Sequence, residues 1–135
     1  MEAYKQGAGI LVMDLNGLKD LNDNLGHTAG DQFLQDAANF ISKFFGRENV
    51  YRTGGDEFAV IMPEIEREEF TRKGVEFREA LKSDKAPNVS VGFSWCDKYE
   101  ELKKALEDAD EHMYKDKAAY YLNHDRRRKH VGENV

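Results

Sequence analysis

The stretch VYRTGGDEFAVIM (residues 50–62) predicts a β-hairpin with two glycines and two carboxylates at its tip. Apolar residues flank the tip on both sides, so Gly54 and Gly55 fall where a tight hairpin turn requires positive φ. A purely structural turn would accept almost any polar residue after them. Asp56 and Glu57 follow instead, so a bulky anionic ligand could approach bare backbone beside hard oxygen ligands for Mg²⁺.

The size and composition of the chain predict one cytoplasmic globular domain. It has 135 residues, of which 40% are hydrophobic and 34% charged, and this suits a single core. Neither an apolar run of about 18 residues nor a signal-like N-terminus is present, so we expect no direct membrane insertion and no secretion. Cys96 is the single cysteine, which excludes an internal disulfide framework.

The formal net charge of −6 argues against a nucleic-acid partner, because such surfaces need a basic face to neutralise phosphates. A nucleotide monomer that is held through a metal ion remains compatible with this charge.

Hydrophobic periodicity predicts the other elements. Ser90, Gly92 and Ser94 give one late strand a face of small residues, so we expect a helix to pack closely on it. The predicted elements are a buried strand at residues 8–13, a short helix, a helix at 28–45, the hairpin, a helix from residue 63 or 64, a strand at 89–95 and a helix at 98–121.

This order predicts an α/β fold, an α+β sandwich whose mainly antiparallel sheet is covered by helices. We expect one domain over residues 1–123, followed by a polar, basic and frayed tail over residues 124–135.

Asp14 ends the first apolar run and is a candidate metal ligand. If this strand pairs with the hairpin, Asp14 and either Asp56 or Glu57 converge at one edge of the sheet, as metal-assisted phosphoryl or nucleotidyl transfer requires. A structural alternative is that Asp14 caps the next helix.

The polar segment after Asp14 also has structural interpretations. Thr28 and Asp31 have the spacing of a capping box, so local evidence favours a capping role for Asp31. His27 has no identifiable partner for catalysis and is interpreted as a packed or hydrogen-bonded residue. Asn22 and Asp23 have the composition of a turn.

Three blocks together resemble, in order and spacing, the signature of the GGDEF family, the diguanylate cyclases. The resemblance extends to Ser90-Val91-Gly92 and to Ala109-Asp110-x-x-Met113-Tyr114-x-x-Lys117, and it covers residues 9–120. The three blocks are Asp14-x-Asn-x-Leu-Lys19-x-x-Asn22-Asp23, Gly26-His27-x-x-Gly30-Asp31 and Arg52-x-Gly54-Gly55-Asp56-Glu57-Phe58.

The resemblance implies a ferredoxin-like fold similar to the palm of nucleotide cyclases and polymerases. It implies that two GTP molecules are condensed into cyclic di-GMP with release of pyrophosphate, across a homodimer in which each subunit holds one GTP. The implied cofactor is Mg²⁺ or Mn²⁺, held by Asp14, Asp56 and the backbone carbonyl of Leu15, with Glu57 as a ligand or in support.

The resemblance also implies roles in substrate binding. Asn22 and Asp31 would read the guanine edge, and the backbone of Gly54 and Gly55 would lie against the nucleotide. Lys19 and Lys117 would reach the phosphates, and His27 is also counted among the GTP-binding residues. The catalytic candidates are Asp14, Asp56, Glu57 and Lys19, and the acceptor of the 3′-hydroxyl proton stays open.

Three departures from the family pattern affect these expectations. Only residues 1–8 precede the first strand, where the family usually has another helix. Phe45 and Glu48 occupy the ends of the usual Arg-x-x-Asp inhibitory product site, and Arg47 is out of register, so no such site is expected. Tyr120 and Tyr121 stand where a phosphate-holding Gly-Arg pair is common, and the arginines at 126–128 are an alternative source of that charge.

These departures leave two other functions open. One is a catalytically impaired module that binds guanine nucleotide or mediates dimerisation or regulation. The other is a cyclase or polymerase relative with another substrate. For the diguanylate cyclase itself we expect a regulatory or sensory domain in the full-length protein, which could be anchored in a membrane.

Overall fold

The computed structural model describes the backbone of residues 7–133 and the side chains of residues 7–123. Its elements in chain order are β1 (Ala8–Leu15), α1 (Leu18–Leu25), α2 (His27–Phe45), a 3₁₀ turn (Arg47–Asn49), β2 (Val50–Arg52), β3 (Glu57–Pro63), α3 (Arg67–Ala80), β4 (Val89–Cys96), a 3₁₀ turn (Tyr99–Glu101) and α4 (Leu102–Glu133).

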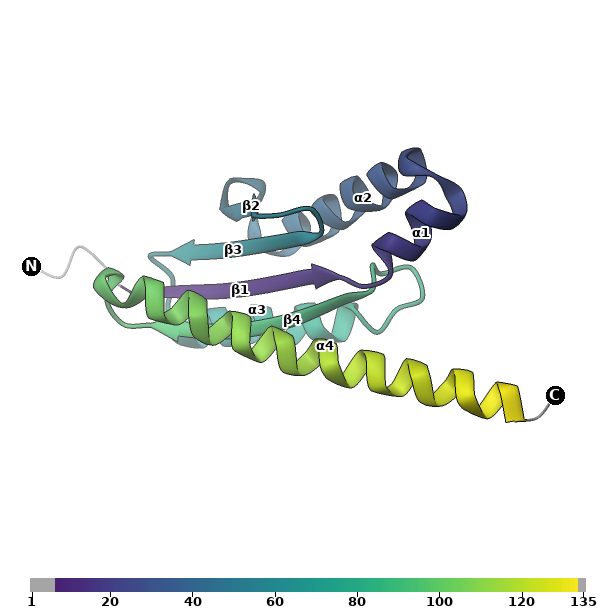
Figure 1. The fold of residues 1–135 in the computed structure, drawn as a ribbon. Coiled ribbons are helices and arrows are strands. Elements are labelled where there is room, and N and C mark those ends of the chain that lie inside the picture. The colour runs from purple at the N-terminus through teal and green to yellow at the C-terminus, as the bar shows by residue number, and fades with distance from the viewer. Residues whose placement is uncertain (1–6, 134–135) are drawn as a thin grey trace, which may run out of the picture.

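The four strands form one antiparallel sheet in the order β2-β3-β1-β4, with β1 at the centre between β3 and β4 (Figure 1). All eight residues of β1 are buried, as expected for an apolar run covered on both faces. This strand order, with helices between β1 and β2 and between β3 and β4, is ferredoxin-like. The predicted α/β fold is therefore confirmed.

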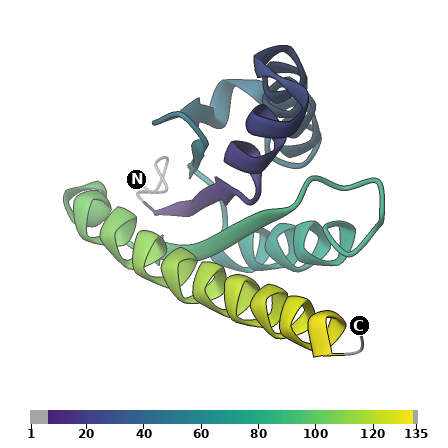
Figure 2. The ribbon, with the colours of Figure 1, turned by 45° about the vertical axis from the view of Figure 1, so that its right-hand side comes forward.

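Helices cover both faces of the sheet, with α2 and α3 on one side and α4 on the other (Figure 2), while α1 lies beyond the end of β1 (Figure 1). Alternate residues of β1 face opposite cores, because successive side chains of a strand point to opposite faces. Leu11 and Met13 lie in the core with Ile41 of α2 and Phe77 of α3. The other core consists of Ala8, Ile10, Val12, Cys96, Ala105, Ala109 and Met113, with Leu102 and Leu106 packed against it.

The small-residue face of β4 packs on α4, as predicted. A Cβ atom on Gly92 would overlap the backbone of Ala109 and Met113, so only glycine fits there. The Ser94 hydroxyl donates a hydrogen bond to the carbonyl of Ala105. This close approach fixes the position of α4 across the sheet, and with it the side chains that α4 presents to the end of β1.

Helix boundaries differ from the sequence expectation, and α4 begins at Leu102, after the 3₁₀ turn, rather than at residue 98. α3 begins at Arg67 rather than at residue 63 or 64, because Pro63 ends β3 and Glu64 adopts a φ of 57° that no helix continues through. α4 continues to Glu133 and projects past the sheet, beyond the predicted end at residue 121 (Figure 1). The side chains of the basic segment at 126–128 lie outside those described, and the phosphate contact expected of them stays a prediction.

Within residues 7–133, no helix combines the length and the apolar character needed to cross a bilayer.

Candidate functional site

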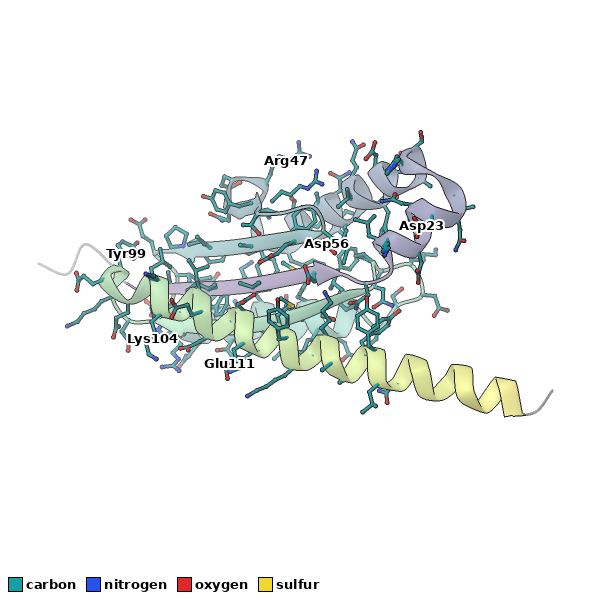
Figure 3. All side chains as sticks on the ribbon, in the orientation of Figure 1. Asp23, Arg47, Asp56, Tyr99, Lys104 and Glu111 are labelled. Atoms are coloured by element: carbon teal, nitrogen blue, oxygen red, sulfur yellow. The ribbon has the colours of Figure 1, made fainter. Side chains whose placement is uncertain are left out.

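A row of polar side chains crosses the sheet on the face that α4 covers. Asp14 of β1 lies directly opposite Glu57 of β3 and Ser90 of β4. The amide of Leu15 donates a 2.8 Å hydrogen bond to the carbonyl of Asp56, which ties the hairpin tip to the end of β1. Figure 3 shows Asp56 at this end of the sheet. The strand pairing therefore brings Asp14 together with both carboxylates of the hairpin.

Lys117 of α4 reaches the centre of this row. Its Nζ donates a hydrogen bond of 2.8 Å to Oδ2 of Asp14, a residue that is only 7% exposed. This bond raises the pKa of Lys117 above its ordinary value, although burial of the amine opposes the effect. Asp14 does not cap the next helix, because α1 is preceded by Gly17 and has no side-chain cap. The capping interpretation of Asp14 is therefore wrong.

Glu57 lies in an environment that disfavours its charge. Burial raises its pKa above the ordinary value of 4.5, and the neighbouring charges of Asp14, Asp110 and Asp56 raise it further. Glu57 and Asp110 also line a hollow of about 330 Å³ between the hairpin and α4. Asp110 was not a candidate from the sequence, although its position seven residues before Lys117 places both on a similar face of α4.

The residues at this end of the sheet fit Mg²⁺. Mg²⁺ uses one or two protein carboxylates together with substrate phosphates, and Asp14, Asp56 and Glu57 offer such hard oxygen ligands. The ammonium group of Lys117 on Asp14 shows that this place already holds positive charge. Among the described side chains, no three His, Cys, Asp or Glu residues form a complete metal cluster, so substrate oxygens would have to complete the coordination.

The two glycines of the hairpin tip do not have the predicted backbone. Within the described residues, the glycines with positive φ are Gly17, Gly26 and Gly46, so the expectation for Gly54 and Gly55 is wrong. The reason is that residues 53–56 form a loop longer than the tight two-residue turn we expected, as the strand ends show. The guanidinium group of Arg52 holds this loop by donating to the carbonyls of Gly54 and Gly55, at 3.1 and 2.7 Å.

The fold itself gives these two positions no need for glycine. A Cβ on Gly55 would meet nothing within 4 Å, and one on Gly54 would lie at an ordinary 3.6 Å from Cβ of Glu57. Both residues are exposed. The conformation of the turn therefore does not explain the two glycines.

Asn22 lies where α1 packs on α2. Its Oδ1 is buried and has no hydrogen-bond partner among the described residues. The side chain lies against Gly30, where an added Cβ would overlap Oδ1 and come within 2.7 Å of Cγ. Asn22 and Asp23 belong to α1, as Figure 3 shows for Asp23, so their interpretation as turn residues is wrong.

Asp31 follows Gly30 on α2 and lines a cleft of about 530 Å³ against the β2–β3 hairpin, with Leu34, Arg52 and Phe58 among its walls. The predicted capping box is not formed, because α2 begins one residue earlier, at His27, and Gly26 precedes it without a side-chain cap. The Asp31 side chain is therefore not used in capping.

Three other predicted positions lie near the surface or in the core. Lys19 and His27 are exposed at the first turns of α1 and α2, so His27 is not packed, which is one of the two structural roles we expected for it. Phe45, which stands where the family's inhibitory motif usually begins, is 2% exposed and belongs to the core.

A partly buried hydrogen-bond network beside the row was not expected from the sequence. The Asn16 amide donates to Oδ1 of Asn88 at 3.0 Å and accepts a 3.1 Å hydrogen bond from the Ser90 hydroxyl. This network links the end of β1 to the start of β4. Its signals in the sequence were Asn16 in the first motif block and the Ser90-Val91-Gly92 match, and neither identifies the partners.

Comparison with known proteins identifies similar chains. The family model described as "Diguanylate cyclase, GGDEF domain" matches residues 2–121. The probable diguanylate cyclase DgcF of Escherichia coli K12 is 32% identical over 122 residues, which are 80% of this chain and 39% of DgcF. DosC of the same strain, named a diguanylate cyclase, is 26% identical and aligns with 78% of this chain and 25% of its own.

An uncharacterized membrane protein of Staphylococcus saprophyticus, SSP1970, is 29% identical over 84% of this chain and 35% of its own. The chain thus spans a quarter to two fifths of these curated relatives. Among solved structures, the GGDEF domain of DgcB from Caulobacter crescentus in complex with c-di-GMP has a TM-score of 0.69 and 26% identity, and the match covers 84% of this chain and 74% of that one.

The structural match confirms the palm-like cyclase fold, and the relatives support a function of the diguanylate cyclase type. The family match covers most of the sequence, and the strand pairing brings the acidic residues of its motifs together. The chain belongs to the GGDEF domain family.

Proposed function

We propose that this chain condenses two GTP molecules into cyclic di-GMP and releases pyrophosphate. The observation that carries the proposal is the placement of Asp14, Glu57 and Lys117 beside a hairpin tip whose glycines the fold does not require. A purely structural hairpin would have no use for two carboxylates and a lysine gathered at the end of a buried strand. The cyclase names of the relatives agree with this assignment.

One GTP would bind along the cleft between α2 and the hairpin. Asp31 would accept hydrogen bonds from the N1–H and amino groups of guanine, which adenine does not reproduce, and Asn22 would complete this recognition. The triphosphate would extend towards Lys117, with Lys19 at the exposed start of α1 as a second cation. The exposed backbone of Gly54 and Gly55 would lie against the nucleotide.

Asp14, Asp56, Glu57 and the carbonyl of Leu15 would hold Mg²⁺ or Mn²⁺. When bound, the ion supplies positive charge at the phosphates and lowers the pKa of an attacking hydroxyl. The residues of the protein orient the groups that react. The 3′-hydroxyl of each GTP gives up its proton, which passes to the solvent, and its oxygen attacks the α-phosphate of the other GTP in line. At each α-phosphate the bond to the β-phosphate breaks, so two phosphodiester bonds form and two pyrophosphates leave.

Two copies of the chain are required, because each subunit holds one GTP and the two must meet face to face. A regulatory or sensory domain in a longer protein would control this encounter, which agrees with the part of each relative that the chain spans. We place the domain in the cytoplasm, where GTP is available.

One observation favours the impaired module as a second candidate. Tyr120 and Tyr121 stack edge to face, with ring centroids 5.0 Å apart, where the family pattern has a phosphate-holding arginine. Calorimetry separates the two functions, since the module binds GTP without forming product.

The direct test compares the wild type with Asp14→Asn in the presence of GTP and Mg²⁺, with cyclic di-GMP measured by chromatography. Asp108→Asn is the matched control. Asp108 also lies on α4, but it pairs with Lys104 at 4.0 Å and does not belong to the proposed site. We expect product from the wild type and from the control, and none from Asp14→Asn. Equal turnover by Asp14→Asn would overturn the proposed site.

A further inference from the structure

The ammonium group of Lys117 is bonded to Asp14, one of the carboxylates of the proposed metal site. Its Nζ lies 2.8 Å from Oδ2 of Asp14, and the two side chains are only 28% and 10% exposed. A divalent ion and an ammonium group on the same carboxylate would repel each other, so each weakens the binding of the other. Asp14 therefore has two possible cationic partners, and the structure shows the one that the chain itself supplies.

We infer that Lys117 acts as an exchangeable cation that couples metal binding to nucleotide binding. Without nucleotide, the ammonium stays on Asp14 and weakens the hold of the site on a divalent ion. A bound triphosphate offers the ammonium another anionic partner, so Asp14 becomes free for the ion. The inference rests on the proposed function and adds to it a reason for the ion and the nucleotide to bind together.

The chemistry of the lysine suits such an exchange. Lysine carries its charge at the end of a flexible four-carbon stem, so it can move between two anions while its helix stays in place. The backbone of α4 is fixed by its packing on Gly92, so the side chain rather than the helix has to move. The surrounding carboxylates of Asp56, Glu57 and Asp110 keep the site negative after the lysine leaves.

The coupling predicts that one substitution raises the affinity for the metal ion and lowers the affinity for GTP. Lys117→Met removes the competing cation, so the free protein should bind Mn²⁺ about fivefold or more tightly, at the lower end of ordinary coupling between sites. The same variant should bind GTP more weakly in the presence of EDTA, because it lacks the phosphate partner. A lysine with only a structural role in the ion pair would not produce a gain in metal affinity.

The experiment titrates Mn²⁺ into nucleotide-free protein and follows free Mn²⁺ by electron paramagnetic resonance. Lys115→Met is the control, because Lys115 is exposed on the same helix and pairs with Glu111 at 3.9 Å, so its loss tests the effect of net charge alone. We expect tighter Mn²⁺ binding for Lys117→Met and no change for Lys115→Met. Lys117→Gln replaces Lys117→Met if the latter does not fold.

Equal or weaker Mn²⁺ binding by a folded Lys117 variant overturns the inference, as does an equal gain in the Lys115 variant. These outcomes do not depend on GTP. Failure of the wild type to bind GTP would count instead against the proposed function, so the two failures are distinguishable.

Discussion

Replacing Gly30 by alanine should separate stability from nucleotide binding. Gly30 is buried in α2, and its missing side chain is the space into which Asn22 packs from α1. A Cβ there would overlap Oδ1 of Asn22 and lie 2.7 Å from Cγ and 3.2 Å from Nδ2. The amide is the far end of a flexible side chain, so it will move rather than break the helix. We expect Gly30→Ala to displace Asn22 while the fold persists.

The size of both effects follows from this geometry. Glycine in a helix interior costs about 1 kcal/mol relative to alanine, so the helix itself gains stability. Displacing Asn22 should offset part of this gain. Loss of one or two hydrogen bonds to guanine costs about 0.5–1.5 kcal/mol each. The dissociation constant for GTP should therefore rise about tenfold, which corresponds to about 1.4 kcal/mol.

Calorimetry with GTP and thermal unfolding of Gly30→Ala, Asn22→Ala and the double variant provide the test. Asn22→Ala removes the three atoms nearest to the added methyl group, so the double variant should bind GTP no worse than Asn22→Ala. Relative to Asn22→Ala, it should also melt about 4 °C higher. Wild-type affinity in Gly30→Ala, or fully additive losses in the double variant, would refute the role of the Asn22–Gly30 contact.

Three further substitutions test the site and the sheet. Because the folded pKa of Glu57 is raised above 4.5, this residue lowers stability as the pH rises from 4.5 through the folded pKa. Glu57→Gln should therefore raise the melting temperature at pH 7 but not at pH 4, and it should abolish product; a lower melting temperature at pH 7 would contradict this sign. Gly55→Ala should leave stability within about 0.5 kcal/mol, as for ordinary surface substitutions, but weaken GTP binding, and unchanged binding would exclude close approach of the nucleotide to the tip. Gly92→Ala should lower the free energy of unfolding by about 1–3 kcal/mol in urea titrations, because its Cβ meets the backbone of α4; a smaller loss would mean that α4 can move away.

Most of the fold could be predicted from local patterns. The period-two face of small residues in β4 predicted a packed helix because it is a property of one strand, and the structure has Gly92 against α4. The start of α2 could not be predicted in this way. Thr28 and Asp31 have the right spacing for a cap. However, Gly26 is both the C-cap of α1 and the N-cap of α2, so α2 starts before Thr28.

The site depends on contacts that no local pattern contains. The sequence predicted that Asp14 and Glu57 converge only if the first strand pairs with the hairpin. The structure has this pairing, between β1 and β3. The bond from Lys117 to Asp14 joins residues 103 positions apart, and the Asn22–Gly30 contact depends on how two helices cross. Family resemblance named these residues, and the structure supplied their partners.

The most direct test of the central claim measures cyclic di-GMP formed from GTP and Mg²⁺ as a function of protein concentration. If two copies each hold one GTP, the rate per subunit should rise with concentration across the micromolar range and level off once dimers dominate. A rate per subunit that is independent of concentration would contradict action across a dimer that forms in this range. No product at any concentration, also from a chain extended at its N-terminus, would contradict the proposed cyclase activity.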